Sequence, residues 1–209
     1  LWSCFWGSCY VWVNPLWRVR MTGRRKIPWR RPCILVSNHQ SMVDIVVLYQ
    51  LFAPYKWVSK KENFKIPILG WQMRLNQYLE IDRGKRDSLL RLMNEAAKNI
   101  KKGNSLLIFP EGTRYPGGIL GPFREGAFKM ALDNQVDIVP IVLDGTAKAL
   151  PKKGVILTGF ANIRARVLDP IPYSSFAGKS SRELSMDIRG LMEKEYTRLW
   201  LLKKGEAPD

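Results

Sequence analysis

The chain has 209 residues, 46% of them hydrophobic and 25% charged, which suits one globular domain or one domain with an appendage. Its 34 basic residues outnumber 18 acidic ones and give a net charge of +16. Such a surface attracts anions, and composition does not choose among nucleic acid, anionic lipid and a phosphorylated substrate. Cys4, Cys9 and Cys33 are an odd set without a metal-ligand spacing such as CxxC, which indicates free thiols in a reducing compartment.

The N-terminal stretch "LWSCFWGSCYVWVNPLW" is free of charge and rich in tryptophan, and the arginine-dense "RVRMTGRRKIPWRR" follows it. This order is typical of a segment at the membrane interface with a cytoplasmic basic flank, and it is the reverse of a signal peptide. The stretch is slightly shorter than the roughly 20 residues of a spanning helix. We therefore expect residues 1–20 to form an apolar, membrane-associating helix and residues 21–209 to form the folded domain. An amphipathic helix packed on its own domain is the alternative.

Past the basic flank, short β-branched runs alternate with longer helical ones. The helix expected over 87–102 has clear end signals, because Asp87 stands at its start, lysines at its end and Gly103 just beyond. The alternation predicts an α/β fold with a partly parallel, mixed sheet flanked by helices. In chain order we expect strand 33–37, helix 42–52, strand 56–59, an interrupted helix 62–75, strand 78–82, helix 87–102, strand 105–109, helix 124–133, strand 137–143, two strands 155–160 and 163–167 that can pair, and helix 181–203.

Three polar clusters follow predicted strands directly. They are Ser37-Asn38-His39, Asp82-Arg83 and the segment 110–114, "PEGTR". Ligands of open α/β sheets gather at the carboxyl ends of the strands. The sequence therefore predicts a site at one edge of the sheet.

His39 is the only histidine of the chain, and Asp44 follows five positions later. On a continuous helix the two side chains would point about 140° apart. They can meet if His39 lies in the loop before the helix and Asp44 on its first turns. Asp44 would then hold Nδ1–H and leave Nε2 as a base. A histidine that caps a helix beside an incidental aspartate is the alternative reading of these two residues.

A base of this kind suits the deprotonation of a substrate hydroxyl or of water, because the chain has no GxSxG elbow and no evident nucleophilic cysteine. Backbone amides near the helix entrance are candidates for an oxyanion hole. With a single histidine and no paired carboxylate–histidine spacing, we predict no metal site.

Basic and glycine-rich segments supply candidates for phosphate binding. "FPEGTRYPGG" lets backbone approach a ligand at Gly112 and offers the planar fork of Arg114, but it is not a Walker P-loop. Lys60 and Lys61 follow one predicted strand, and Arg83 follows another. Each cation alone fits an ordinary surface group, whereas together at one edge they would form an anion site beside His39.

Four segments, in this order, resemble the motifs of the glycerolipid acyltransferase family, whose bacterial representatives are 1-acyl-sn-glycerol-3-phosphate acyltransferases. They are "NHQSMVD" (38–44), "KKENFKIPILGW…IDR" (60–83), "FPEGTR" (109–114) and "VPIVL" (139–143). An HxxxxD pattern alone is common, but its combination with FPEGTR some seventy residues later is specific. The family's second block often has a glycine shortly before the strand that leads to Arg83, where this chain has Asn76-Gln77.

The resemblance implies a glycerol-phosphate acyltransferase-like fold and a transfer of a fatty acyl group to the sn-2 hydroxyl of 1-acyl-sn-glycerol 3-phosphate (lysophosphatidic acid), giving phosphatidic acid. The donor would be a coenzyme A or acyl-carrier-protein thioester, with no cofactor. By position, His39 would be the general base and Asp44 its orienting partner. The implied substrate-binding residues are Lys60, Arg83, Glu111, Gly112, Thr113 and Arg114, with Pro140 shaping the site. The partners would include anionic lipids at the cytoplasmic face of the cell inner membrane.

Three alternatives remain at this stage. The same chemistry can act on another lysolipid or on glycerol 3-phosphate. An inactive membrane scaffold can keep the fold, although the intact His39–Asp44 pair argues against it. A basic nucleic-acid-binding protein would show a zinc-finger spacing or an RNP-like box. The sequence has neither, and its aromatic residues concentrate in the uncharged N-terminal segment, so we expect no nucleic-acid partner.

Overall fold

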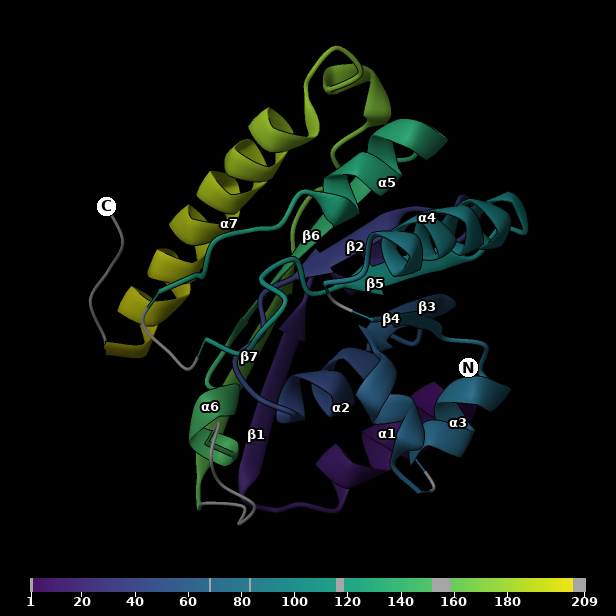
Figure 1. The fold of residues 1–209 in the computed structure, drawn as a ribbon. Coiled ribbons are helices and arrows are strands. Elements are labelled where there is room, and N and C mark those ends of the chain that lie inside the picture. The colour runs from purple at the N-terminus through teal and green to yellow at the C-terminus, as the bar shows by residue number, and fades with distance from the viewer. Residues whose placement is uncertain (1, 68, 83, 116–118, 152–158, 205–209) are drawn as a thin grey trace.

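The computed structural model describes residues 2–67, 69–82, 84–115, 119–151 and 159–204. Within these residues a seven-stranded sheet has the order β1-β7-β6-β2-β5-β3-β4 (Figure 1). Neighbouring strands are parallel except for β6 and β7, which are antiparallel. The strands are β1 (Trp17–Thr22), β2 (Ile34–Ser37), β3 (Tyr55–Lys60), β4 (Leu79–Ile81), β5 (Ser105–Ile108), β6 (Ile138–Asp144) and β7 (Ala161–Val167).

Helices cover both faces of this sheet (Figure 1). One face packs against α4, α5 and α7, and the other against α1, α2 and α6. The α-helices are α1 (Trp2–Trp12), α2 (Val43–Tyr49), α3 (Leu69–Leu75), α4 (Arg86–Lys101), α5 (Gly126–Asn134), α6 (Thr146–Ala149) and α7 (Ser181–Lys204), and short 3-10 turns are η1 (Arg24–Lys26), η2 (Lys61–Lys65) and η3 (Tyr173–Ser175).

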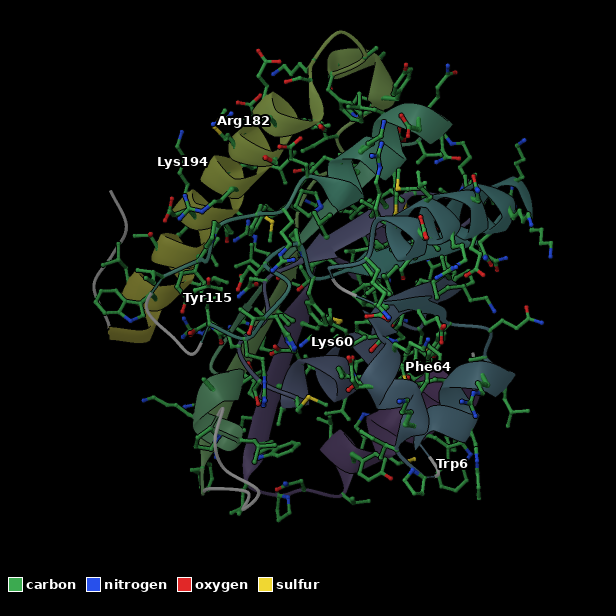
Figure 2. All side chains as sticks on the ribbon, viewed as in Figure 1. Trp6, Lys60, Phe64, Tyr115, Arg182 and Lys194 are labelled. Atoms are coloured by element: carbon green, nitrogen blue, oxygen red, sulfur yellow. The ribbon has the colours of Figure 1, made fainter. Side chains whose placement is uncertain are left out.

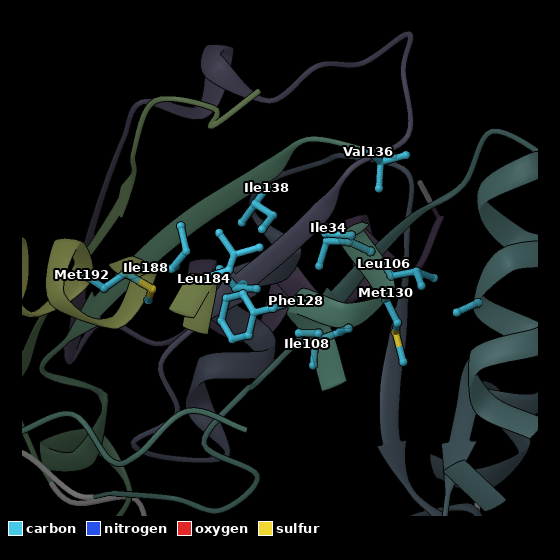
Figure 3. Packing of buried hydrophobic residues seen from close by; sticks show 14 of the residues in the cluster. Ile34, Leu106, Ile108, Phe128, Met130, Val136, Ile138, Leu184, Ile188 and Met192 are labelled. Atoms are coloured by element: carbon cyan, nitrogen blue, oxygen red, sulfur yellow. The ribbon is translucent and has the colours of Figure 1, made fainter. Parts of the chain in front are cut away.

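The period of two along the strands divides the core into two layers. In β2, Ile34 and Val36 join the cluster around Phe128 of α5, whereas Leu35 between them joins the opposite cluster around Val47 of α2. Figure 3 shows Ile34 and Phe128 with the α7 side chains that close the first cluster. Because both faces are covered, β2 and β5 are buried at every position rather than alternately, and all but one residue in each is apolar. The predicted α/β fold with a partly parallel sheet is confirmed.

Most elements expected from the sequence are present. The strands expected at 33–37, 56–59, 78–82, 105–109, 137–143 and 163–167 correspond to β2 through β7, and the interrupted helix 62–75 divides into η2 and α3 on either side of Pro67. The expected helix 42–52 is shorter, since α2 ends at Tyr49. The strand expected at 155–160 lies mostly outside the described residues.

Strand β1 was not expected, because the dense arginines of its sequence, WRVRMT, indicated a basic flank. Trp17, Val19 and Met21 alternate with exposed Arg18 and Arg20, pack on the core and leave the cations outside. The strand pairs in parallel with β7 at the edge of the sheet. The boundary expected between residues 20 and 21 therefore falls inside a strand of the sheet.

Helix α1 lies against the domain through one face and is exposed through another. Cys4, Ser8 and Val11 are buried, while Phe5 and Trp12 are exposed. Gly7 permits close packing on α2, because a Cβ there would lie 2.1 Å from a ring carbon of Tyr49. No helix in the described part of the chain is long and apolar enough to cross a membrane.

Candidate active site

The loop between β2 and α2 brings the HxxxxD residues to the carboxyl edge of the sheet. Strand β2 ends at Ser37 and α2 begins at Val43, so His39 lies in the loop and Asp44 in the first turn of the helix. Asn38 fastens this loop to β6, since its side-chain amide donates to the Leu143 carbonyl (2.9 Å) and its side-chain oxygen accepts from the Leu143 amide (2.7 Å). These bonds satisfy a buried polar side chain and fix the start of the loop.

His39 and Asp44 are in direct contact, as the sequence predicted. His39 Nδ1 lies 2.7 Å from Asp44 Oδ2, and the Asp44 side chain is fully buried. The same carboxylate oxygen accepts hydrogen bonds from the backbone amides of Gln40 (2.6 Å) and Ser41 (2.8 Å). Because this oxygen already accepts from two amides, it is the acceptor toward the imidazole as well. The proton between the pair therefore belongs on Nδ1, and Nε2 is the ring nitrogen that remains for chemistry.

The amides at the helix entrance are occupied by these contacts. Gln40 and Ser41 donate to Asp44, and the Val43 amide donates to the Ser41 hydroxyl at 3.3 Å. The expectation that amides here form an oxyanion hole is therefore wrong for these three groups, because two of them donate to the aspartate and the third to the Ser41 hydroxyl.

The segment after β5 supports His39 from its other sides. The imidazole stacks on the Phe109 ring, with centroids 4.0 Å apart and planes 12° apart. The Tyr115 amide donates to the His39 carbonyl at 2.8 Å. Glu111 is buried and accepts a hydrogen bond from the His39 backbone amide. Ring, amide and carbonyl of His39 are thus each held by the 109–115 segment.

Glu111 is the strongly perturbed acid of this site. Its pKa is raised to about 8, chiefly by burial; the hydrogen bond from the His39 amide lowers it, the nearby Asp44 charge raises it, and the Arg189 guanidinium lowers it. Its Oε2 atom has no hydrogen-bond partner within the described residues. A neutral Glu111 at physiological pH avoids a second buried negative charge beside Asp44.

A cavity of about 280 Å³ opens beside His39. Its polar wall comes from the ends of β3 and β5 and includes Ser59, Lys60, Asn63, Gly112, Thr113 and Arg114. Its apolar wall is formed by Met42, Ile45, Tyr49, Trp57, Val58, Met73, Tyr78 and Phe109. The hydroxyl groups of Tyr49 and Tyr78 lie 3.2 Å apart. One cavity therefore combines a histidine, two cations and an apolar surface.

The structure brings most of the expected site residues together. Lys60, at the end of β3 near the centre of the molecule (Figure 2), lines the cavity with His39, Gly112, Thr113 and Arg114. Glu111 is not among the described residues that line the cavity, because it is buried against the backbone of His39. Arg83 lies outside the described residues.

Pro140 is not among the described residues that line the cavity. The expectation that it shapes this site is therefore wrong for the wall of the cavity. Pro140 lies within β6 opposite Val36, and its carbonyl accepts from the Leu168 amide at 2.9 Å. Its place is in the sheet, one strand away from the cavity.

Sequence reasoning missed the apolar wall and the stacking role of Phe109. Met42, Ile45 and Tyr49 are spaced three and four positions apart, so they share one face of α2. That spacing was available in the sequence, but a core-facing stripe has the same pattern. Only the packing of α2 beside β3 shows that this face lines a cavity.

The geometry agrees with comparisons to known proteins. A family model described as Acyltransferase matches residues 18–144. This chain belongs to the acyltransferase family. Its HxxxxD segment, its FPEGTR segment and the cavity between them all lie within the matched range.

Several relatives of this chain are named for one activity. A chloroplast 1-acyl-sn-glycerol-3-phosphate acyltransferase of Brassica napus is 36% identical over 160 residues, covering 76% of this chain and 46% of the relative. One from Chlamydomonas reinhardtii is 38% identical over 152 residues, covering 72% and 44%. The chain thus spans about half the length of these curated relatives. The crystal structure of the 1-acyl-sn-glycerophosphate acyltransferase PlsC from Thermotoga maritima superimposes with a TM-score of 0.81 at 25% identity, covering 94% of this chain and 78% of that one.

Proposed function

We propose that this protein transfers a fatty acyl group from a thioester donor, acyl-coenzyme A or acyl-carrier protein, to the sn-2 hydroxyl of lysophosphatidic acid. The observation that carries the proposal is the His39–Asp44 pair beside a cavity that also receives Lys60 and Arg114. A base, cations for a phosphate and an apolar surface for an acyl chain are the groups that this reaction requires. The names of the relatives support the same acceptor.

In this proposal His39 acts as the general base. Its Nε2 accepts the proton of the sn-2 hydroxyl while the hydroxyl oxygen bonds to the thioester carbonyl carbon. Asp44 stabilises the imidazolium that forms, because its buried charge lies 2.7 Å from Nδ1. When the tetrahedral intermediate collapses, the carbon–sulfur bond breaks and the leaving thiolate takes the proton from the imidazolium. An activated thioester needs no protein nucleophile and no cofactor.

Lys60 and Arg114 are placed to bind the acceptor phosphate. Both line the His39 cavity, and Lys60 is exposed at its mouth. Arginine binds phosphate oxygens through a planar fork, and lysine acts as a point charge. The apolar wall formed by Met42, Ile45 and Met73 then suits a hydrocarbon chain. Arg83 keeps its expected part in phosphate binding as a proposal from the sequence.

The exposed apolar side chains of α1 and α3 support contact with a membrane surface. Trp6 is 51% exposed and Trp71 63% exposed, and Ser3 of α1 donates a 2.6 Å hydrogen bond to Asn76, the residue that follows α3. Figure 2 shows Trp6 at the edge of the molecule, away from the charged Arg182 and Lys194 of α7. Tryptophan at an interface beside arginines suits an anionic bilayer surface. We place this surface at the cytoplasmic face of the cell inner membrane.

The test is acyl transfer in mixed micelles, from labelled palmitoyl-coenzyme A or palmitoyl-acyl-carrier protein. Lysophosphatidic acid, other lysolipids and glycerol 3-phosphate serve as alternative acceptors. The wild type should form phosphatidic acid, and His39→Ala should lose at least about 100-fold in kcat, the scale of a removed general base. Lys60→Gln should raise KM for lysophosphatidic acid, while Lys101→Gln, the same change on the exposed surface of α4, should not. Product formed equally by His39→Ala would refute the proposal, and a preference for another acceptor would reassign the substrate.

A further inference from the structure

A second cavity of about 400 Å³ lies on the other side of the segment that follows β5. Val58, Phe109 and Gly112 line both this cavity and the one that contains His39. The two cavities are therefore adjacent and share a wall made by the ends of β3 and β5. The function proposed above uses only the first.

The interior of the second cavity is apolar. Leu92 of α4 and Met130 of α5 are each 2% exposed, and Ile81 of β4 and Ile108 of β5 complete this part of the wall. Figure 3 shows Ile108 and Met130 within the packed layer between the sheet and the helices. A concave apolar surface of this volume lies within the range of small-ligand sites, roughly 300–1,000 Å³.

The mouth of this cavity is cationic. Lys85, Arg86 and Arg124 line it and are exposed, and the one carboxylate of the described wall, Asp82, pairs with Lys85 at 3.1 Å. The remaining positive charge favours an anionic group above the apolar interior. The cavity thus has the polarity of an amphipathic anion with one hydrocarbon chain.

Gly112 places one of these cations at the junction of the two cavities. Its φ is +69°, and a Cβ there would lie 2.8 Å from Arg124 Nε. A side chain would therefore be strained by the backbone angle and would also collide with the guanidinium stem. Because Gly112 lines both cavities, an anion beside Arg124 lies next to the entrance of the His39 cavity.

We propose that the second cavity binds the sn-1 acyl chain of lysophosphatidic acid, while the His39 cavity binds the acyl chain of the donor. The proposal rests on the function proposed above and divides that reaction between two apolar sites. The reaction brings two molecules with acyl chains, the donor and the acceptor, to His39. Each of the two cavities has one apolar region that can bind one acyl chain. The sn-1 ester is one carbon away from the sn-2 hydroxyl. A chain in the second cavity therefore leaves the hydroxyl near the shared wall, and the phosphate lies at the junction of the two cavities, where Arg124 adds its charge to those of Lys60 and Arg114.

Gly126 offers a substitution that fills the second cavity without disturbing the packing. It is the first residue of α5 and lines the cavity, and a Cβ added there meets no atom within 4 Å. Gly190 in α7 is the matched control, because its Cβ would also meet no atom within 4 Å and it is not among the described residues of either cavity. Leu89→Ala is a second variant, since Leu89 lines the cavity from α4 and is 44% exposed, so its loss leaves the core intact.

The experiment measures binding in the His39→Ala background, where no turnover consumes the ligands. Calorimetry gives the affinities of octanoyl and myristoyl lysophosphatidic acid, below their micellar concentrations, and of palmitoyl-coenzyme A. Each methylene buried in the cavity tightens binding by about fourfold, so the myristoyl form should bind far more tightly. The ratio of the myristoyl to the octanoyl affinity should fall at least tenfold in Gly126→Leu and severalfold in Leu89→Ala. In Gly190→Leu this ratio should stay as it is without the substitution. The affinity of palmitoyl-coenzyme A should stay unchanged in all three.

The other outcomes overturn the assignment. Weaker binding of palmitoyl-coenzyme A in Gly126→Leu would place the donor chain in this cavity. Unchanged affinities for every ligand would mean that the acceptor chain stays outside the protein. Binding does not depend on turnover, so a wild type that binds as expected but forms no phosphatidic acid would refute the proposed function and leave the second site in place.

Discussion

Replacement of Asp44 by asparagine tests whether the buried carboxylate acts through its charge. An asparagine side-chain oxygen can still accept from His39 Nδ1 and from the amides of Gln40 and Ser41, which now lie 2.6 to 2.8 Å from Asp44 Oδ2. The loop should keep its shape, because all three hydrogen bonds survive. What disappears is the negative charge next to the imidazolium that forms during the reaction.

The size of the effect follows from this geometry. Two unit charges about 4 Å apart interact by roughly 4 kcal/mol at an effective dielectric constant of about 20. A neutral hydrogen bond to the asparagine returns about 1 kcal/mol of this. The remaining roughly 3 kcal/mol corresponds to a loss in kcat of about 100-fold to 200-fold, with little change in KM for either substrate.

Steady-state kinetics with lysophosphatidic acid and palmitoyl-coenzyme A measure this loss in Asp44→Asn, in His39→Ala and in the double variant. Residues that act as one unit are not additive, so the double variant should be no slower than His39→Ala within about threefold. Asp137→Asn is the matched control, because Asp137 accepts from the Tyr173 amide at 3.0 Å, away from the site. Losses that multiply in the double variant, or an Asp44→Asn enzyme within about threefold of wild type, would show that Asp44 does not act through His39.

Three further predictions concern residues around the site. The pKa of Glu111 is raised to about 8 from an ordinary 4.5, so between these pH values the folded state holds a proton that the unfolded state releases, and stability falls as the pH rises from 4.5 to 8. Urea unfolding between pH 6 and pH 9 should therefore show that the wild type loses roughly 2 to 3 kcal/mol more of its free energy of unfolding than Glu111→Gln does. Parallel curves of stability against pH for the two proteins would contradict this. Gln77 has a φ of +53°, so Gln77→Gly should raise the free energy of unfolding by about 1 kcal/mol, and a lower melting temperature would refute the strain. Phe109→Leu removes the ring stacked on His39 and should lower kcat about threefold to tenfold, whereas unchanged kcat would deny the ring a positioning role.

The strand and helix order could be predicted because the chain's own periodicity encodes it. Runs such as 33–37 and 105–109 are apolar except for one serine each, and β2 and β5 are indeed buried at every position. The contact between His39 and Asp44 was also predictable, since a loop followed by a helix is the local arrangement that joins residues five apart. Local sequence carried both results.

Elements whose stability comes from distant partners were harder to predict. In β1, Val19 and Met21 alternate correctly for a strand, but the three basic residues of the following turn, Arg24, Arg25 and Lys26, outweighed that signal. Its partner, β7, begins at Ala161 and lies more than a hundred residues further along the chain. In a strand at the edge of a sheet with one exposed face, only every second residue is apolar, whereas a central strand is apolar at nearly every position. Whether such a segment forms a strand therefore depends on its pairing with a neighbour more than on its composition.

The sequence by itself determined the α/β class, the edge of the sheet at which polar residues gather, and the identity of His39, Asp44, Lys60 and Arg114. Only the tertiary structure decided that Glu111 is buried behind His39, that Pro140 lies outside the described wall of the His39 cavity, and that Phe109 and Gly112 separate two cavities. The physical reason is that a motif fixes which groups are present and how neighbours along the chain can meet. Burial and cavities depend on how α2, α4 and α5 pack over strands far away in sequence, and no local pattern contains that packing.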